Sequence, residues 1–482
     1  LCPVWAARSP RHGDDGLRAG YGAGNRAGEM SLSLVVAQEP VVRCRRVRMG
    51  VSTPSPVQRV DALVSRGMAN PVVMVAVLLM VGVVAALALS IAGSGAEATT
   101  GADFAVFHTA GELSAEGASD LLYEDRFAEL ANDKFAGDDE GNLIYLNPPV
   151  MAQVLQPLSA VPYRTAFLLW SAVTLVLTGA ALALLRAPKP FWLLALVVPP
   201  AVLNFQLGQN GAVGLVILAG VFALLRSDRP AEAGLVASLV LFKPTLALGV
   251  GVWWLITYRR HWRALLGAAA GGAVIVATSM VGVGGEPWRR FVEVATGESS
   301  GRSTWFTTAS VTPWEFWREL LIGAEWLVMP LWLATAVVGV AAFRWFVRRT
   351  EGRWAMHLAG AVALTPWLAP HLLIYDWVIL FVPAVIVWTA VPEQREQWVQ
   401  LGAWLVIAAV VWRTSSAQID AFGRAVQFGV VIYGWVAVRA ARSLVDRAVS
   451  AGDEGGDPFL GAPDDGGTVL DDDRALHEAR VL

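Results

Sequence analysis

Long apolar stretches, separated by short polar segments, run along most of this chain. A helix needs about 20 apolar residues to cross a bilayer, and somewhat fewer when it lies inside a bundle. Membrane-spanning helices are therefore predicted over residues 71–93, 163–186, 190–205, 210–226, 264–283, 325–343, 354–369, 372–391, 398–412 and 420–439. The pattern predicts an all-α polytopic membrane protein.

The apolar stretch 231–257 is ambiguous, because it could form one long helix or two short ones. Lys243-Pro244 interrupts it, and proline removes a helical donor while disfavouring helix in the preceding residue. Two short helices that meet at Lys243 also place all the arginine clusters between the spans on one side of the membrane, as the positive-inside rule requires. We therefore predict about twelve helices, with both termini cytoplasmic.

This topology assigns a long acidic segment to the outer face. Residues 94–147 carry twelve Asp and Glu residues against only Arg126 and Lys134. The predicted extracytoplasmic loops are 94–162, which is the long first loop, and 284–324. Because the inner connections are short and basic, chemistry is expected on the outer face.

Composition agrees with a membrane protein and sets the outer limits of the membrane domain. Hydrophobic residues make up 55% of the chain, charged residues 16%, and the mean hydropathy is +0.51, which excludes an ordinary soluble globular protein. Residues 1–68 read as a disordered cytoplasmic arm, part of which could be a start-site artefact, and 446–482 as a disordered acidic cytoplasmic tail. The multi-span domain is expected over 69–445.

Asp103 stands directly behind the first predicted span, at the start of the acidic loop. A carboxylate at the lip of a helical bundle is a candidate general base. The alternative is that Asp103 caps a helix, and the two roles are compatible. Phe104, Phe107, Leu113 and Leu121, with polar residues between them, predict that this helix is amphipathic and lies on the membrane.

Proline breaks follow further along the loop. Asn147-Pro148-Pro149 precedes residues 149–160, which are predicted to form a short re-entrant or interfacial helix rather than a span. An entry turn into the next span is the alternative. Lys243 lies in an apolar stretch, where an ionisable group is functional if it faces the bundle and structural if it snorkels to the headgroups.

The segment around Pro370-His371 places several polar residues at an outer helix start. His371 and Tyr375 are four residues apart and so share a helix face. Asp376 falls in the first turn, where its charge could serve only to balance the helix dipole. No metal-ligand cluster, phosphate-binding loop or nucleic-acid signature is visible in the sequence. The two cysteines, Cys2 and Cys44, both precede the first span and cannot form a disulfide bond within the outer loops.

Several of these segments together resemble glycosyltransferase family 87, the actinobacterial polyprenol-phosphate-mannose-dependent α-mannosyltransferases. The resemblance extends over about residues 70–440. Its motifs are Asp103 with Leu122-Tyr123, Tyr145-x-Asn147-Pro148-Pro149, Gln156-Pro157-Leu158, Tyr163-Arg164-x-Ala166-Phe167-x-x-Trp170, Gly208-Gln209-Asn210, Ala233-Gly234, Phe242-Lys243-Pro244 and Pro370-His371 before Tyr375-Asp376. The family usually has Tyr-Pro-Pro where this chain has Asn147-Pro148-Pro149, so the role of that turn stays open.

The resemblance implies a GT-C-type bundle in the plasma membrane and an inverting sugar transfer on its outer face. The donor would be polyprenyl-phosphate mannose and the acceptor a glycolipid or glycan, with no nucleotide cofactor and no nucleic-acid partner, while the need for a divalent metal stays open. Asp103 matches the family's base, and His371 its late outer-face histidine. Binding of the donor phosphate or the substrate is expected from Lys243, His371, Tyr375, Asp376, Gln209, Asn210 and Asn147, with Arg289, Arg290 or Arg302 as further cations.

Two alternatives remain at this point. One is a polyprenyl-phosphate-dependent arabinofuranosyl or other pentosyl transferase, since the shape of the pocket rather than any motif decides the sugar. The other is a polytopic lipid or solute transporter, which would need a polar path through the membrane. The predicted spans are almost uncharged between the outer polar cluster and the inner basic loops, which favours the enzyme.

Overall fold

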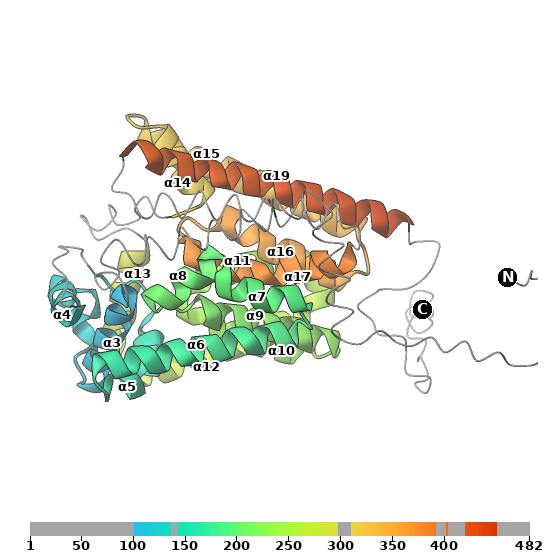
Figure 1. Cartoon of the computed structure of the whole chain (residues 1–482). Helices are drawn as coiled ribbons and strands as arrows, with labels where there is room; N and C mark the ends of the chain where they lie inside the picture. The colour runs from blue at the N-terminus through green and yellow to red at the C-terminus, as the bar shows by residue number, and fades with distance from the viewer. Residues whose placement is uncertain (1–100, 136–142, 297–309, 392–401, 403–419, 451–482) are drawn as a thin grey trace, which may run out of the picture. The chain divides into compact units, whose positions relative to one another are not determined.

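The computed structural model describes residues 101–135, 143–296, 310–391, 402 and 420–450 (Figure 1). Nearly all of these residues form α-helices or short 3-10 helices. Within these ranges the only β feature is an isolated antiparallel bridge between Ser310 and Leu373. The prediction of an all-α protein is therefore confirmed for the described part of the chain.

The first half of the chain begins with short helices and continues into longer ones. In order these are α3 (Ala102–Ala115), η2 (Ser119–Tyr123), α4 (Asp125–Phe135), α5 (Pro149–Ser159), α6 (Tyr163–Leu184), α7 (Lys189–Val197), α8 (Pro199–Leu207), α9 (Gly211–Arg226) and α10 (Pro230–Ser238). Helix α5 coincides with the short helix predicted over 149–160.

The second half alternates long helices with short helical segments. In order these are η3 (Leu239–Phe242), η4 (Pro244–Ala247), α11 (Leu248–Ile256), α12 (Tyr258–Val283), α13 (Glu286–Thr296), α14 (Pro313–Leu320), η6 (Glu325–Leu327), α15 (Val328–Arg349), α16 (Trp354–Leu368), η7 (Ile374–Leu380), α17 (Phe381–Ala390) and α19 (Asp420–Ser450).

Three described helices are long and apolar enough to cross a membrane, namely Tyr163–Leu184, Tyr258–Val283 and Glu325–Arg349. The pair α7 and α8 is bent by 48° and counts as a fourth if it is one broken span. These helices overlap four of the predicted spans, while the predicted total of about twelve stays a prediction. The predicted span 71–93, the span 398–412 apart from residue 402, the arm 1–68 and the end of the tail lie outside the described residues.

The predicted break at Lys243 is present. The 3-10 segment η3 ends at Phe242 and η4 begins at Pro244, with Lys243 between them in a non-helical conformation (φ −152°, ψ 78°). Pro244 cannot donate a backbone hydrogen bond and pushes the residue before it away from helix. The two apolar segments Pro230–Phe242 and Pro244–Ile256 therefore meet at this lysine.

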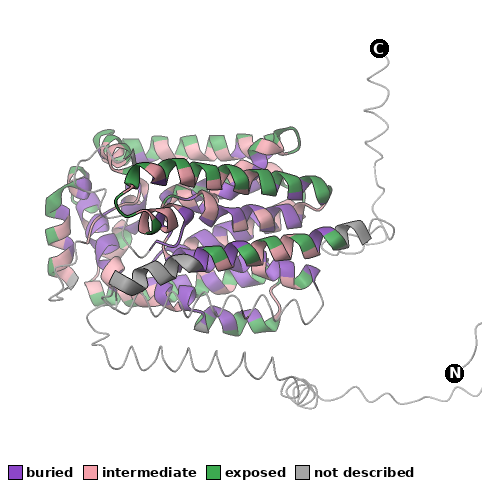
Figure 2. Cartoon of the chain, turned by 90° about the horizontal axis from the view of Figure 1, so that it is seen from above, coloured by how far each residue is buried: buried purple, intermediate pink, exposed green. Residues whose placement is uncertain are grey.

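The part of the predicted loop 94–162 that the structure describes folds into packed helices, and α3 lies among them. Phe104 and Phe107 are buried as predicted, but so are Ala105, His108 and Thr109 on the other sides of the helix. The prediction of an amphipathic helix lying on the membrane is thus wrong, because α3 packs against α4 on one side and α5 on another. Figure 1 shows these three helices gathered at one end of α6, and Figure 2 shows buried residues continuing through the interior.

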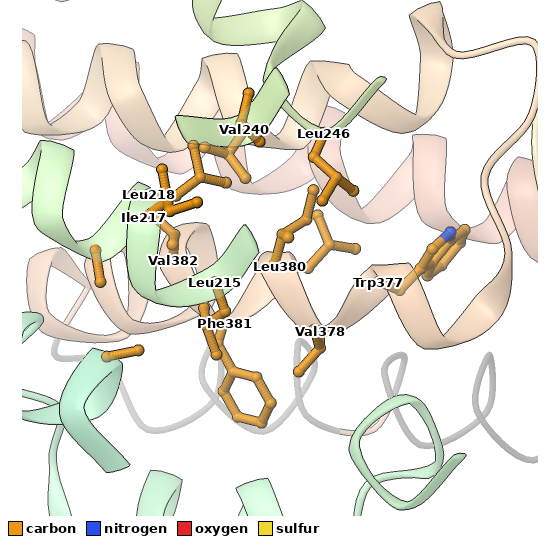
Figure 3. Packing of buried hydrophobic residues seen from close by; sticks show 14 of the residues in the cluster. Leu215, Ile217, Leu218, Val240, Leu246, Trp377, Val378, Leu380, Phe381 and Val382 are labelled. Carbon is orange, nitrogen blue, oxygen red and sulfur yellow. The ribbon is translucent and has the colours of Figure 1, made fainter. Parts of the chain in front are cut away.

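One densely packed part of the core lies where α9 packs against η7 and α17. Leu215 and Leu218 of α9 face Leu380 and Val382, and all four side chains are fully buried or nearly so (Figure 3). Close packing of this kind leaves little freedom to the elements that form it. The core therefore fixes where η7 starts, and with it the positions of the polar residues at that start.

Candidate functional site

Asp103 occupies the first turn of α3 and is half-buried. The side-chain amide of Gln209 donates a hydrogen bond from Nε2 to Asp103 Oδ2 at 2.6 Å. Asp103 is not the helix cap, which corrects that alternative. The cap position belongs to Gly101, whose φ of 86° lies in the left-handed region that glycine adopts without strain, and no side chain caps this helix. The Asp103 carboxylate is thus directed at a partner 106 residues away in the chain.

That partner lies in the turn between α8 and α9, residues 206–210. The turn is fastened to the start of α3 by a hydrogen bond from the Gly101 amide to the Gln206 carbonyl oxygen, 2.7 Å long. Gly208 has a φ of 72°, and a Cβ there would lie 2.5 Å from Cβ of Phe104. The close approach of α3 to this turn therefore requires glycine at position 208.

Aromatic residues of α6 hold the same junction from the side. Tyr163, Phe167 and Trp170 stand at i, i+4 and i+7 on one helix face and surround the ring of Phe104, with ring centroids 5.8, 5.8 and 6.4 Å from it. The Tyr163 hydroxyl donates to the carbonyl oxygen of Gly101 at 2.7 Å. Trp170 Nε1 donates to the carbonyl oxygen of Gly208 at 2.8 Å. The aromatic motif seen in the sequence thus serves to position Asp103 and its turn.

A second carboxylate and a cation form the other half of the site. Lys243 Nζ lies 2.7 Å from Asp376 Oδ1, and Asp376 is fully buried while the Lys243 side chain keeps 16% of its exposure. The backbone amide of Leu373 donates to Asp376 Oδ2 at 3.0 Å. The ammonium group also lies 5.2 Å from the ring centroid of Tyr375. Both oxygens of Asp376 are engaged, and Lys243 faces the bundle interior rather than snorkelling outward.

The two halves act on each other electrostatically. Burial raises the pKa of Asp103 above its ordinary value. The Gln209 hydrogen bond and the charge of Lys243 lower the pKa of Asp103, and the charge of Asp376 raises it. Burial, and then the charge of Lys243, lowers the pKa of His371 to about 3, so that this imidazole is neutral near pH 7. Asp103, Lys243, Asp376 and His371 therefore form one electrostatic group.

Three further predicted residues have different surroundings. Tyr375 lies beside the Gln209 amide and is buried. Asn210 is fully buried, and neither polar atom of its side chain has a hydrogen-bond partner among the described residues. Asn147 accepts a hydrogen bond from the Tyr123 hydroxyl on its backbone carbonyl, 2.7 Å long. In the described ranges no hydrogen bond joins Asn147 to Asp103 or Lys243. Asn147 is therefore not grouped with these residues.

The described arginines among the predicted cations form ion pairs with carboxylates other than Asp103 and Asp376. Arg289, which is exposed, and Arg290, which is half-buried, lie on α13 and pair with Glu286 and Glu293 of the same helix. Arg290 also approaches Glu124 at 3.4 Å. Arg302 lies outside the described residues. Lys243 is therefore the cation that the structure places beside Asp376.

Two hollows lie apart from Asp103 and Lys243. An almost entirely apolar groove of ≈510 Å³ lies between α7, α15, α16, α17 and α19, with Phe343, Trp367 and Trp388 among its walls. A polar hollow of ≈570 Å³ separates η2 and α4 from α13 and includes Asp120 and Arg290. In the part of the chain that the structure describes, no group of three or more His, Cys, Asp or Glu side chains could hold a metal ion.

Comparison with known proteins gives one match. Residues 145–370 match the family model of glycosyltransferase family 87. This confirms the family resemblance over that segment, which contains Gln209 and Lys243 and excludes Asp103, His371 and Asp376. No curated protein and no solved structure matches the chain. The match supports a glycosyltransferase of the membrane, and the apolar helices agree with it.

Proposed function

We propose that this chain is a membrane glycosyltransferase that transfers mannose from polyprenyl-phosphate mannose to a glycolipid or glycan on the outer face of the plasma membrane. The observation that carries the proposal is that a half-buried Asp103 carboxylate and a partly buried cation, Lys243, belong to one electrostatic group. The family match over 145–370 supports the reaction class.

Asp103 is suited to act as the general base. Gln209 binds its Oδ2, whereas Oδ1 makes no hydrogen bond with any described residue and can accept a proton. In the proposed step, Oδ1 takes the proton of an acceptor hydroxyl while the hydroxyl oxygen forms a bond to the anomeric carbon of the donor sugar. The bond from that carbon to the phosphate oxygen breaks, and the configuration at the anomeric carbon inverts.

Lys243 is suited to hold the departing phosphate. The leaving polyprenyl phosphate takes the bonding electron pair and gains one negative charge, and a preorganised ammonium group stabilises this charge most when water is excluded. Asp376 keeps Lys243 in place when no donor is bound, since its two oxygens are fixed by the lysine and the Leu373 amide. His371, whose imidazole is neutral near pH 7, would offer the phosphate a polar contact without adding a second positive charge.

The position of this group at one end of the helices agrees with a lipid-linked donor. Helices α6, α12 and α15 expose large apolar side chains such as Leu168, Val281 and Val338, which suits contact with lipid. The acidic α3–α4 layer belongs on the outer side by the charge rule. A donor with its polyprenyl tail in the membrane and its phosphate at the outer surface would reach Lys243 from the lipid.

A direct assay tests the proposal. Membranes that contain the full chain, or its Asp103→Ala variant, are incubated with radiolabelled polyprenyl-phosphate mannose and a lipid extract, and label in the acceptor fraction is counted. Asp120→Ala is the matched control, because Asp120 is an exposed acid of the same outer layer. The expected result is transfer that disappears with Asp103→Ala and persists with Asp120→Ala.

The same assay separates the alternatives. Transfer from polyprenyl-phosphate arabinose but not from the mannose donor would replace mannose by a pentose and keep the reaction. If neither donor gives Asp103-dependent transfer to lipid or glycan, the glycosyltransferase proposal fails and a transporter becomes the better hypothesis. Outside labelling of a cysteine introduced at position 120 tests the assigned face independently.

A further inference from the structure

We infer that Gln209 is a positioning residue for Asp103, which holds one carboxylate oxygen so that the other faces the acceptor hydroxyl. This assignment rests on the proposed function and replaces the expectation that Gln209 binds substrate. Its basis is the hydrogen bond of 2.6 Å from Gln209 Nε2 to Asp103 Oδ2. The bond leaves Oδ1 as the oxygen that can receive the acceptor's proton.

The Gln209 side chain is already committed within the protein. It retains only 6% of its exposure, its Nε2 is used by Asp103, and the amide lies beside the Tyr375 hydroxyl. A buried amide whose groups face protein partners has little left to offer a sugar or a phosphate. Substrate contact therefore falls to the partly exposed groups, Asp103 and Lys243, and Gln209 acts through Asp103.

The backbone below Gln209 is fixed independently of that side chain. The backbone N–H of Gln209 donates to the Asn204 carbonyl oxygen at 2.8 Å, and the backbone N–H of Gly101 donates to the Gln206 carbonyl oxygen. Trp170 holds the Gly208 carbonyl oxygen, and Phe104 packs against Gly208. Because these contacts already fasten the turn to α3, the Gln209 side chain is not needed to hold the two together. What it adds is the orientation of one carboxylate.

The chemical nature of the partner fits this role. A cation in direct contact with Asp103 would stabilise the charged carboxylate strongly and reduce its basicity. A neutral amide fixes the carboxylate with a weaker effect, while Lys243 stays with Asp376. Gln209 therefore orients the base and leaves it basic enough to take a proton.

Kinetics of three full-length variants in membranes test the inference. Gln209→Met keeps the length of the side chain and removes the donor. Gln209→Glu keeps the shape and carries a donor only when the introduced carboxyl is protonated. Gln153→Met is the matched control, since Gln153 also uses Nε2 for a hydrogen bond, to the Ser279 carbonyl oxygen at 3.3 Å, far from Asp103 in the chain.

The expected results distinguish orientation from binding. Gln209→Met should lower kcat roughly 10- to 100-fold, with the KM for the lipid donor changed less than about threefold, because the lost contact acts on the base. The acidic limb of kcat/KM should move up by about one pH unit, since a donor that favours the ionised carboxylate is gone. Gln209→Glu should be nearly inactive at neutral pH and regain activity as the pH falls. Gln153→Met should resemble the unaltered enzyme.

Other outcomes overturn the inference. A raised donor KM with an unchanged acidic limb would make Gln209 a substrate-binding residue, and an equal loss at every pH would make it structural. If Gln209→Met does not fold, Gln209→Asn provides the second variant, because it stays polar yet is one methylene too short to reach Oδ2, and the same shift of the limb is expected. Transfer that survives Asp103→Ala would contradict the proposed function instead, so the two failures are distinguishable.

Discussion

The two carboxylates of the candidate site, Asp103 and Asp376, have opposite surroundings. Asp103 lies in the first turn of α3, is half-buried, and has one neutral partner on one oxygen, Gln209. Asp376 lies in the first turn of η7, is fully buried, and has both oxygens occupied, by Lys243 and by the Leu373 amide. These surroundings suit the two residues to different roles, Asp103 to that of the proposed base and Asp376 to that of a fixed counter-charge.

The partners decide the difference. A carboxylate paired with an ammonium group and a backbone amide is stabilised in its charged form and has no oxygen left for a substrate proton. A carboxylate held by an amide in a buried place keeps a raised pKa and a usable oxygen. We therefore expect Asp103 to govern the rate and Asp376 to govern the integrity of the site.

The largest effect is expected from Asp103→Asn, which removes the proposed base and keeps the shape of the side chain. Single-turnover transfer should slow by roughly 10²- to 10⁴-fold, the usual contribution of a general base. The protein should still fold, as thermal unfolding in detergent would show. A variant Asp376→Asn that folds normally and yet loses more transfer than Asp103→Asn would reverse the roles assigned to the two carboxylates.

The next largest effect is expected on stability at the ion pair. Asp376→Leu leaves Lys243 without its counter-charge and should cost about 3 kcal/mol in the free energy of unfolding, the low end for a buried pair because Lys243 keeps some exposure. The double variant Asp376→Leu with Lys243→Met should recover most of this stability and remain inactive. Thermal unfolding and transfer assays on the same samples measure both. Recovered activity in the double variant would exclude Lys243 from the phosphate site.

A smaller loss is expected from Gly208→Ala on the Asp103 side. The left-handed φ of 72° and the Cβ of Phe104 leave no room for the added methyl group. The cost should be about 2 kcal/mol, from backbone strain and overpacking, together with slower transfer as the Gln209 turn shifts. Gly323→Ala is the control for strain alone, since Gly323 also has a positive φ but nothing within 4 Å of its Cβ position.

The smallest effect concerns pH. Burial raises the pKa of Asp103 above 3.8, so transfer should fall as the pH drops through this raised value. The folded state binds this proton more tightly than the unfolded chain, so the contribution to stability is present below the unfolded pKa and is lost as the pH rises through the folded pKa. Asp103→Asn should therefore unfold at a slightly higher temperature than the unaltered protein at pH 7. An equal or lower temperature would mean that burial of Asp103 carries no cost.

Much of the fold follows from the sequence because its strongest signals are local. Apolar length predicted the long helices α6, α12 and α15, and the chemistry of proline predicted the break at Lys243. The packing of α3, α4 and α5 was harder to predict. Alternating apolar and polar residues suggested a surface helix over Phe104 to Leu121, whereas α4 and α5 cover the polar side of α3. Burial by distant segments leaves no local pattern to detect.

The site was predictable in its membership more than in its pairing. Asp103, Gln209, Lys243 and Asp376 were each singled out by residue type and place, but nothing local indicates that Asp103 pairs with Gln209 and Lys243 with Asp376. These contacts join residues 106 and 133 positions apart.

The turn between α8 and α9 sets the distance across which the reaction would take place. Its Gln209 contacts Asp103 on one side, and Gly211, directly after it, lies so close to the other half that an added Cβ would be 2.9 Å from the Tyr375 carbonyl oxygen. The turn therefore sets the spacing between Asp103 and the half of the site that contains Lys243. Its length in residues, together with the glycine at position 208, fixes the spacing that an acceptor hydroxyl and a sugar would fill in the proposed reaction. Lengthening the turn by one residue would displace both the contact of Gln209 with Asp103 and the close packing of Gly211 against Tyr375.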